Sequence, residues 1–146
     1  MTERQIKAQF SSAKDDWETP QDFFDRYNNA YHFTLDAASS DENAKCQNHY
    51  TIADDGLHKN WGGQTVWLNP PYGRGIGKWV QKAYEEAQKP GTVVVCLLPA
   101  RTDTAWFHDY CRKGQITFIR GRLKFGGSKN SAPFPSMVVE FRRKEE

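Results

Sequence analysis

Asn69, Pro70, Pro71 and Tyr72 are consecutive in the middle of the chain, and together they suit chemistry on a planar nitrogen. An amine attached to an aromatic ring is a poor nucleophile, because its lone pair is delocalised into the ring. The side-chain carbonyl of Asn69 and the backbone carbonyl of Pro70 could accept hydrogen bonds from such an amine, and Pro71 restricts Pro70 to extended geometry. The Tyr72 ring could stack on a base turned out of its helix. The tetrapeptide therefore indicates methyl transfer to an amino nitrogen, achieved by positioning and electrostatics without a strong base.

The same tetrapeptide could also be a simple turn, because Asn, Pro and Gly are common turn residues. Its context favours a site, since it directly follows an apolar strand expected over residues 65–68. A second cluster, Asp36-Ala37-Ala38, closes a strand expected over residues 32–36, although Asp36 could also be a helix cap or a turn residue. Ligands of α/β sheets bind at the carboxyl ends of strands, so both clusters are expected at one edge of a sheet.

Helices and strands alternate in the hydrophobic pattern that surrounds these clusters. Thr19 would cap a helix with Pro20 at its first position. Further helices are expected over residues 40–47 and 77–88 and from Thr102 or Asp103 to about Cys111, and further strands over 92–98, 116–119 and 137–141. The order predicts one α/β domain over residues 15–146, with helices on both faces of the sheet, after a mobile arm over residues 1–14.

Composition sets limits on the function. The chain has 146 residues and a formal net charge of +2, which is too small to indicate nucleic-acid binding by itself. Residues 114–144 contain seven Lys or Arg against one acid, so this part could face phosphates or could be only a solvated surface. Aromatic residues make up 14% of the chain, and Trp61, Trp67 and Trp79 are more often core residues than platforms for bases.

Metal sites, disulfides and membrane segments find little support in the sequence. The three cysteines have no CxxC spacing and the four histidines have no ligand spacing, so no metal site is expected. No stretch has the length and apolar character of a signal peptide or a membrane span. A reducing cytoplasm is the expected location.

Seven sequence blocks in a fixed order resemble the phage-type DNA N-6-adenine methyltransferases. They are Trp17-Glu18-Thr19-Pro20, Leu35-Asp36-Ala37-Ala38, Asn43-Ala44-Lys45-Cys46, Asp55-Gly56-Leu57, Trp67-Leu68-Asn69-Pro70-Pro71-Tyr72, Leu98-Pro99-Ala100-Arg101-Thr102 and Gly121-Arg122-Leu123. The resemblance covers about residues 16–141. It implies a reduced Rossmann-like methyltransferase sheet, S-adenosylmethionine as cofactor, the exocyclic amine of adenine in DNA as acceptor, and a phage or prophage gene expressed in a bacterial host.

The resemblance also implies roles for individual residues. Asn69, Pro70, Pro71 and Tyr72 would form the catalytic motif. The cofactor would be bound by Asp36, Ala37 and Ala38, which stand where larger relatives have a glycine-rich motif, by Asp54 or Asp55, and by Trp17, Thr19 and Pro20, which would close its site. The missing FxGxG motif is a departure from those relatives.

Cationic residues near these blocks are candidate DNA contacts. Arg74 and Lys78 belong to or follow a glycine-rich segment that could form a flexible lip on the substrate pocket. Arg101, Arg122 and Lys124 are further candidates. The chain offers no room for a separate target-recognition domain, so sequence readout would come from loops or from a partner subunit.

Two other functions remain open from the sequence. The same chemistry could act on RNA adenine, a cytosine amine or a protein glutamine. A DNA-binding module without catalysis is the other reading, supported by the missing glycine-rich motif. The recognition sequence and the oligomeric state are not specified by these residues.

Overall fold

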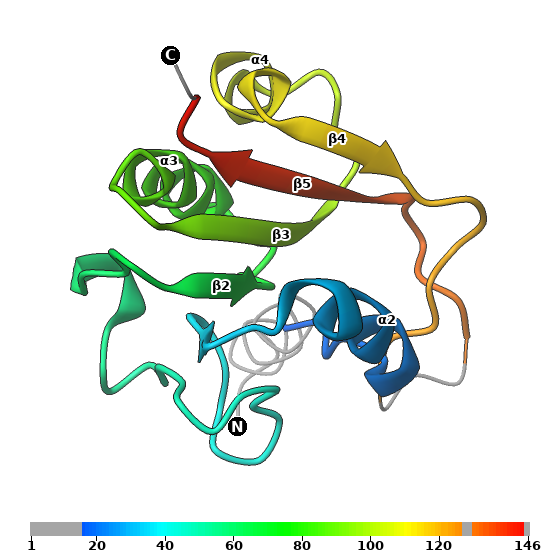
Figure 1. Cartoon of the computed structure of the whole chain (residues 1–146). Helices are drawn as coiled ribbons and strands as arrows, with labels where there is room; N and C mark the ends of the chain where they lie inside the picture. Colours follow the sequence, from blue (N-terminus) through cyan, green and yellow to red (C-terminus); the bar gives the residue numbers. More distant parts are fainter. Residues whose placement is uncertain (1–15, 127–129, 145–146) are drawn as a thin grey trace, which may run out of the picture.

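A five-stranded mixed sheet forms the centre of the computed structural model, which describes residues 16–126 and 130–144. The strand order is β1-β2-β3-β5-β4. The strands are β1 (Leu35–Asp36), β2 (Thr65–Leu68), β3 (Val93–Pro99), β4 (Gln115–Phe118) and β5 (Ser136–Arg142). Figure 1 shows β2, β3, β5 and β4 side by side. The mobile arm expected over residues 1–14 lies outside the described residues.

Strand direction places several strand ends at one edge of the sheet. β1 pairs parallel to β2 and β2 pairs parallel to β3, with Asp36 opposite Trp67 and Leu68 opposite Cys96. β5 runs antiparallel to both of its neighbours, β3 and β4, so β4 points the same way as β3. The carboxyl ends of β1, β2, β3 and β4 therefore share one edge.

Helices cover both faces of this sheet, as the sequence predicts. On one face, α3 (Ile76–Ala87) packs its Tyr84 against Phe141 of β5, with ring centroids 5.9 Å apart. On the other face, α2 (Gln21–Tyr31) packs its Phe24 against Trp67 of β2, with centroids 5.3 Å apart. Trp61 and Trp67 are buried in the core between these layers, which is the more common of the two readings of such residues.

The beginning of α2 differs from the expectation. The helix begins at Gln21, Pro20 occupies the N-cap position, and no side chain caps the helix. Thr19 is not its cap, and the Thr19 hydroxyl accepts a hydrogen bond from Asn69. β1 is also shorter than expected, because His32 adopts a left-handed conformation that ends α2 and only Leu35 and Asp36 pair with β2.

The helix expected over residues 40–47 is absent, and the segment is a series of turns and bends. Side chains satisfy the backbone there: Ser40 N donates to Asn43 Oδ1, Asn43 N donates to Ser40 Oγ, and Lys45 N donates to Asp36 Oδ2. Asn and Ser compete with helix formation in this way.

The other elements fall within a few residues of their expected positions. β2 matches residues 65–68, and α3 begins one residue before and ends one residue before the expected helix. α4 (Ala105–Asp109) is capped by Thr104, whose hydroxyl accepts from Phe107 N, and is followed by the 3-10 turn η2 (Cys111–Lys113). The caps expected at Thr102 or Asp103 are therefore wrong.

In the part of the chain that the structure covers, no helix is long and apolar enough to cross a membrane.

Candidate active site

A cavity of about 400 Å³ opens at the carboxyl ends of β1 and β2. Its walls come from four parts of the chain: the segment 16–19 before α2, the loop that follows β1, the end of β2 with the residues after it, and Gly126. Trp79 of α3 also lines it. This volume lies in the range of small-molecule and cofactor sites.

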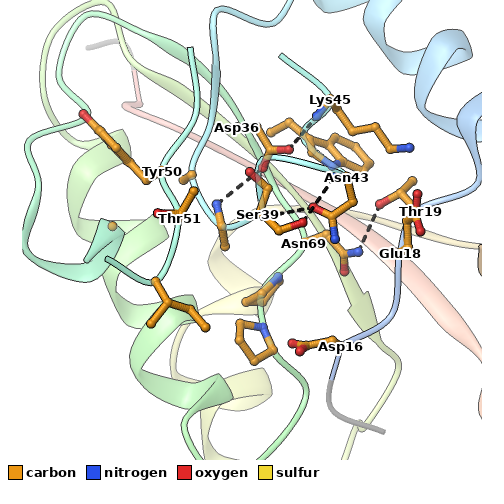
Figure 2. A pocket seen from close by; sticks show the side chains of 18 of the residues that line it. Asp16, Glu18, Thr19, Asp36, Ser39, Asn43, Lys45, Tyr50, Thr51 and Asn69 are labelled. Carbon is orange, nitrogen blue, oxygen red and sulfur yellow. Dashed lines mark hydrogen bonds between the residues drawn. The ribbon is translucent and has the colours of Figure 1, made fainter. Parts of the chain in front are cut away.

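Most of the candidate catalytic and cofactor-binding residues surround this cavity. Those that line it are Trp17, Thr19, Asp36, Ala37, Ala38, Asp55, Asn69, Pro70 and Pro71. Pro20, Asp54 and Tyr72 lie outside the lining. Figure 2 shows Asn69 beside Thr19, and Asp36 beside Lys45, around the same cavity.

The Asn69 side chain is held in one orientation. Its Nδ2 donates to the backbone carbonyl of Trp17 and, at 3.0 Å, to the hydroxyl of Thr19. A backbone carbonyl can only accept, so the amide nitrogen must face Trp17 and the amide oxygen must face away from it. Oδ1 is buried and has no hydrogen-bond partner among the described residues. A buried carbonyl without a donor costs roughly 1–3 kcal/mol, so this atom is suited to a ligand that brings a donor.

The segment that holds Asn69 is itself fixed from the opposite side. The Trp17 ring packs edge-on against Phe125 and Phe134, with centroid separations of 5.4 and 5.0 Å. Glu18 O accepts a 2.8 Å hydrogen bond from Gly126 N. Two distant parts of the chain thus clamp the wall of the cavity next to Asn69.

The Tyr72 ring is buried in the core, whereas the sequence analysis expected it to be available for stacking on a base. Its side chain is 3% exposed, its hydroxyl donates to Leu97 O at 3.0 Å, and its ring contacts Phe125 and Phe134 edge-on. Burial raises the pKa of the Tyr72 phenol well above its ordinary value. In this conformation the ring offers no free face to a base, so the stacking expected from the sequence requires the ring to move.

Asp36 both organises the loop after β1 and lines the cavity. The carboxylate accepts from Lys45 N at 2.9 Å and Ala38 N at 3.4 Å, and the residue is 2% exposed. Burial raises the pKa of the Asp36 carboxyl to about 6, which the two backbone donors only partly oppose. Asp36 is therefore a turn residue and a cavity residue at once.

Asp54 and Asp55, the two alternative cofactor-binding residues, have different surroundings in the structure. Asp54 Oδ2 accepts from Thr51 N at 2.8 Å and from Thr51 Oγ1 at 3.1 Å, which makes Asp54 a surface turn residue. Asp55 lines the cavity, and its carboxylate shares a 2.6 Å hydrogen bond with His58 Nδ1. Of the two residues, only Asp55 lines the cavity.

Close backbone packing shapes the floor of the cavity. Gly56 is buried, and a Cβ at this position would lie 2.3 Å from Ala37 O and 3.3 Å from the Trp79 ring. Only glycine fits here without displacing the strand end that carries Ala37 and Ala38.

Several lining residues were missed in the sequence. They are Asp16, Glu18, Ser39, Ser40, Asn43, Lys45, Tyr50, Thr51, Ile52, Gly56 and Gly126, together with Trp67 and Trp79, which were expected to be core residues. Some of these residues belong to the polar loop over residues 40–47, which was expected to be a helix. Ser39 Oγ is a second buried cavity atom without a partner in the described part of the chain.

The candidate DNA contacts lie outside the cavity. Arg101 Nη1 donates to the backbone carbonyl of Tyr72 at 3.2 Å, and Arg122 Nη1 donates to Ala132 O at 3.4 Å. Arg74, Lys78 and Lys124 are exposed.

Among the residues that the structure describes, no group of three or more His, Cys, Asp or Glu side chains could hold a metal ion.

Two comparisons connect this geometry with known proteins. The model of the DNA N-6-adenine-methyltransferase (Dam) family matches residues 7–144. A DNA N-6-adenine-methyltransferase of Escherichia phage T1 is 31% identical to this chain over an alignment of 151 positions. The alignment covers 84% of this chain. The match spans 63% of the length of the phage protein.

Proposed function

Because the chain belongs to the DNA N-6-adenine-methyltransferase (Dam) family, we propose that it methylates the exocyclic amino group of adenine in DNA, with S-adenosylmethionine as methyl donor. The observation that carries the proposal is the fixed Asn69 carboxamide, whose buried Oδ1 has no partner among the described residues. The phage T1 relative is a DNA N-6-adenine-methyltransferase, which supports the same acceptor.

The cavity suits the cofactor in size and in chemistry. Its volume of about 400 Å³ is in the range of cofactor sites. Asp36 would bind the ammonium group and Asp55 the ribose hydroxyls, while the small side chains of Ala37 and Ala38 would allow close approach to the backbone. Ser39 Oγ, buried and without a partner in the described residues, is a further group available to the cofactor. S-adenosylmethionine would supply an electrophilic methyl group on its sulfonium.

Asn69 and Pro70 would prepare the adenine amine for attack. Asn69 Oδ1 and Pro70 O accept hydrogen bonds from the two N–H groups, which draws the nitrogen toward tetrahedral geometry and localises its lone pair. The cofactor would supply the methyl group by breakage of its carbon–sulfur bond, leaving S-adenosylhomocysteine, and the methylated nitrogen would release one proton to water. Asn69 Oδ1 and Pro70 O would hold the amine in place by accepting its hydrogen bonds. Trp17 and Thr19 hold the amide of Asn69 so that its oxygen, not its nitrogen, meets the substrate.

The remaining assignments belong to the same proposal. The sheet would be a reduced Rossmann-like methyltransferase sheet within a domain over residues 15–146, supported by the position of the cavity at the carboxyl ends of parallel strands. Tyr72 would complete the catalytic motif, and Arg74, Lys78, Arg101, Arg122 and Lys124 would contact DNA. The enzyme would act on DNA in the cytoplasm of a bacterial host, encoded by a phage or prophage.

A labelling experiment tests the proposal. The purified protein is incubated with methyl-labelled S-adenosylmethionine and, in parallel, with DNA, RNA or protein. Label in N6-methyladenine of DNA is expected; label only in RNA or protein would overturn the assigned acceptor, and binding of DNA without any transfer would favour a non-catalytic module.

Asn69→Ala tests the residue at the centre of the proposal. The variant should lose most methyl transfer while it keeps its fold and its cofactor affinity, because Oδ1 faces the acceptor. Asn29→Ala, at an exposed position of α2 outside the cavity, is the matched control and should transfer methyl at the normal rate.

A further inference from the structure

A second hollow, here called the arginine groove, lies between α2 and the segment that follows β4. It has a volume of about 580 Å³ and is lined by Phe23, Arg26, Tyr27, Ala30 and Tyr31 on α2 and by Phe118, Ile119, Arg120 and Leu123 beyond it. The α2 residues fall on one stripe of the helix, at the spacing of i, i+3, i+4, i+7 and i+8. Asp22 and Asp25 of the same helix lie on a different stripe and do not line the groove.

The arginine groove and the cavity lie along the same edge of the sheet. β4 ends at Phe118, which pairs with Met137 of β5, and Met137 pairs with Leu98 near the carboxyl end of β3. Two short segments also join the two hollows. Thr19 lines the cavity and Phe23 the groove, while Leu123 lines the groove and Gly126 the cavity. These segments are four and three residues long and span at most roughly 14 and 11 Å, so the hollows are neighbours.

The groove and the segment that leads from it to the cavity are cationic. Among the described residues that line the groove, two are arginines and none is an acid. Arg120, Arg122 and Lys124 are exposed and alternate along the chain, while Leu123 and Phe125 between and after them are more buried. The three cations follow β4 along the chain toward Gly126, and the backbone turns between the first two of them at Gly121, whose φ is +77°.

An aromatic side chain contacts Arg26, one of the two arginines of the groove. The guanidinium of Arg26 lies over the Phe23 ring, 5.3 Å from its centroid, and the Tyr27 ring lies 5.2 Å from that of Phe23. Arg26 itself is exposed. This arrangement keeps a guanidinium at the surface in a defined position, where it can contact a phosphate and where planar groups can stack.

We propose that the arginine groove binds the phosphate backbone of the DNA strand that flanks the target adenine, with Arg26 and Arg120 as phosphate contacts. Arg122 and Lys124 continue this contact toward the cavity, where the adenine amine would meet Asn69 beside the cofactor. The inference rests on the proposed function for the identity of the ligand. A second copy of the chain is disfavoured as the occupant, because a two-fold interface centred on the groove would bring two arginines from each copy together with no acid from the residues that line it.

The test is the salt dependence of DNA binding by Arg26→Ala/Arg120→Ala. Fluorescence anisotropy with a labelled duplex gives the slope of log K against log salt for each protein. Each phosphate contact contributes close to one unit to this slope, so the double variant should lose roughly two units of slope. Arg26→Lys/Arg120→Lys keeps both charges and should retain most of the slope.

Arg112→Ala is the matched control, because Arg112 is an exposed arginine in η2, before β4, at the opposite end of that strand. Its slope should equal that of the unmodified protein. An unchanged slope in the alanine double variant, or an equal loss in Arg112→Ala, would overturn the arginine groove as a DNA contact. Methyl transfer to DNA by the unmodified protein is measured in parallel, so that failure of the groove and failure of the proposed function give different results.

Discussion

The amide nitrogen of Asn69 donates a 3.0 Å hydrogen bond to the hydroxyl of Thr19. Thr19 is 3% exposed, so water does not compete for this contact. The Trp17 carbonyl, which can only accept, determines which end of the carboxamide faces the cavity, and the Thr19 contact holds the amide nitrogen in that orientation. Asn69 therefore depends on the segment before α2 for its orientation, and this dependence can be measured.

Thr19→Val should lower kcat about fivefold and leave KM for DNA nearly unchanged. The substitution keeps the shape of the side chain but removes the acceptor, and a neutral hydrogen bond contributes about 1 kcal/mol. Steady-state methyl transfer at saturating cofactor gives both constants. Thr19→Ser keeps the hydroxyl and should restore kcat; a Ser variant as slow as the Val variant would show that packing, and not the hydrogen bond, is what Thr19 supplies.

Cofactor affinity should fall about tenfold between pH 7 and pH 5. Burial raises the pKa of Asp36 to about 6, so the carboxylate is ionised at pH 7 and mostly neutral at pH 5. A neutral Asp36 no longer attracts the ammonium group of the cofactor, so binding weakens as the pH falls through 6 and is level above about 7. Isothermal titration calorimetry with S-adenosylmethionine measures the effect.

Asp36→Asn separates this titration from that of His49, which lies near Asp36 and has its own raised pKa, caused chiefly by its hydrogen bond with Asp41. The variant should bind the cofactor more weakly at pH 7 and with little dependence on pH. A dependence that persists unchanged in Asp36→Asn would assign the titration to another group.

Gly56→Ala should lower the free energy of unfolding by about 1–3 kcal/mol, the usual cost of forcing a methyl group into a packed site. The new Cβ would lie 2.3 Å from Ala37 O, and backbone atoms cannot move aside as a flexible side chain can. Urea denaturation followed by tryptophan fluorescence measures the change. Gly75→Ala is the control, since nothing lies within 4 Å of a Cβ built at Gly75; equal effects of the two substitutions would exclude the close contact as the cause.

Tyr72→Phe should lower the free energy of unfolding by about 1 kcal/mol, because Leu97 O loses the donor that Tyr72 supplies at 3.0 Å. Methyl transfer should continue, because the ring that would stack on adenine after moving out of the core is retained. Denaturation and steady-state rates are measured on the same preparation. A large loss of rate with unchanged stability would instead give the hydroxyl a direct part in the reaction.

The sequence predicts the sheet well because its strands are locally distinctive. The apolar run of β3 and the short run of β2 between glycines and prolines have few alternative structures. The loop over residues 40–47 was mistaken for a helix because its hydrogen bonds come from side chains such as Asn43, which local patterns do not reveal.

The site could be predicted in part only. Asp36, Asn69 and Pro70 stand at strand ends, where position along the chain already indicates position in space. The orientation of Asn69 depends on Trp17 and Thr19, which are far away in the sequence. The burial of Tyr72 depends on Phe125 and Phe134, and no local pattern specifies such tertiary contacts.

The distance along the chain between Asn69 and Thr19 also bears on the order of folding. Their hydrogen bond joins residues 50 apart, and the clamp on the other side of Trp17 comes from Phe125 and Phe134, which are farther away still. Closing loops of this length has an entropic cost that is recovered only when the intervening strands have paired. The site should therefore be among the last parts of the molecule to form, so that methyl transfer during refolding reports completion of the whole fold and not of any one element.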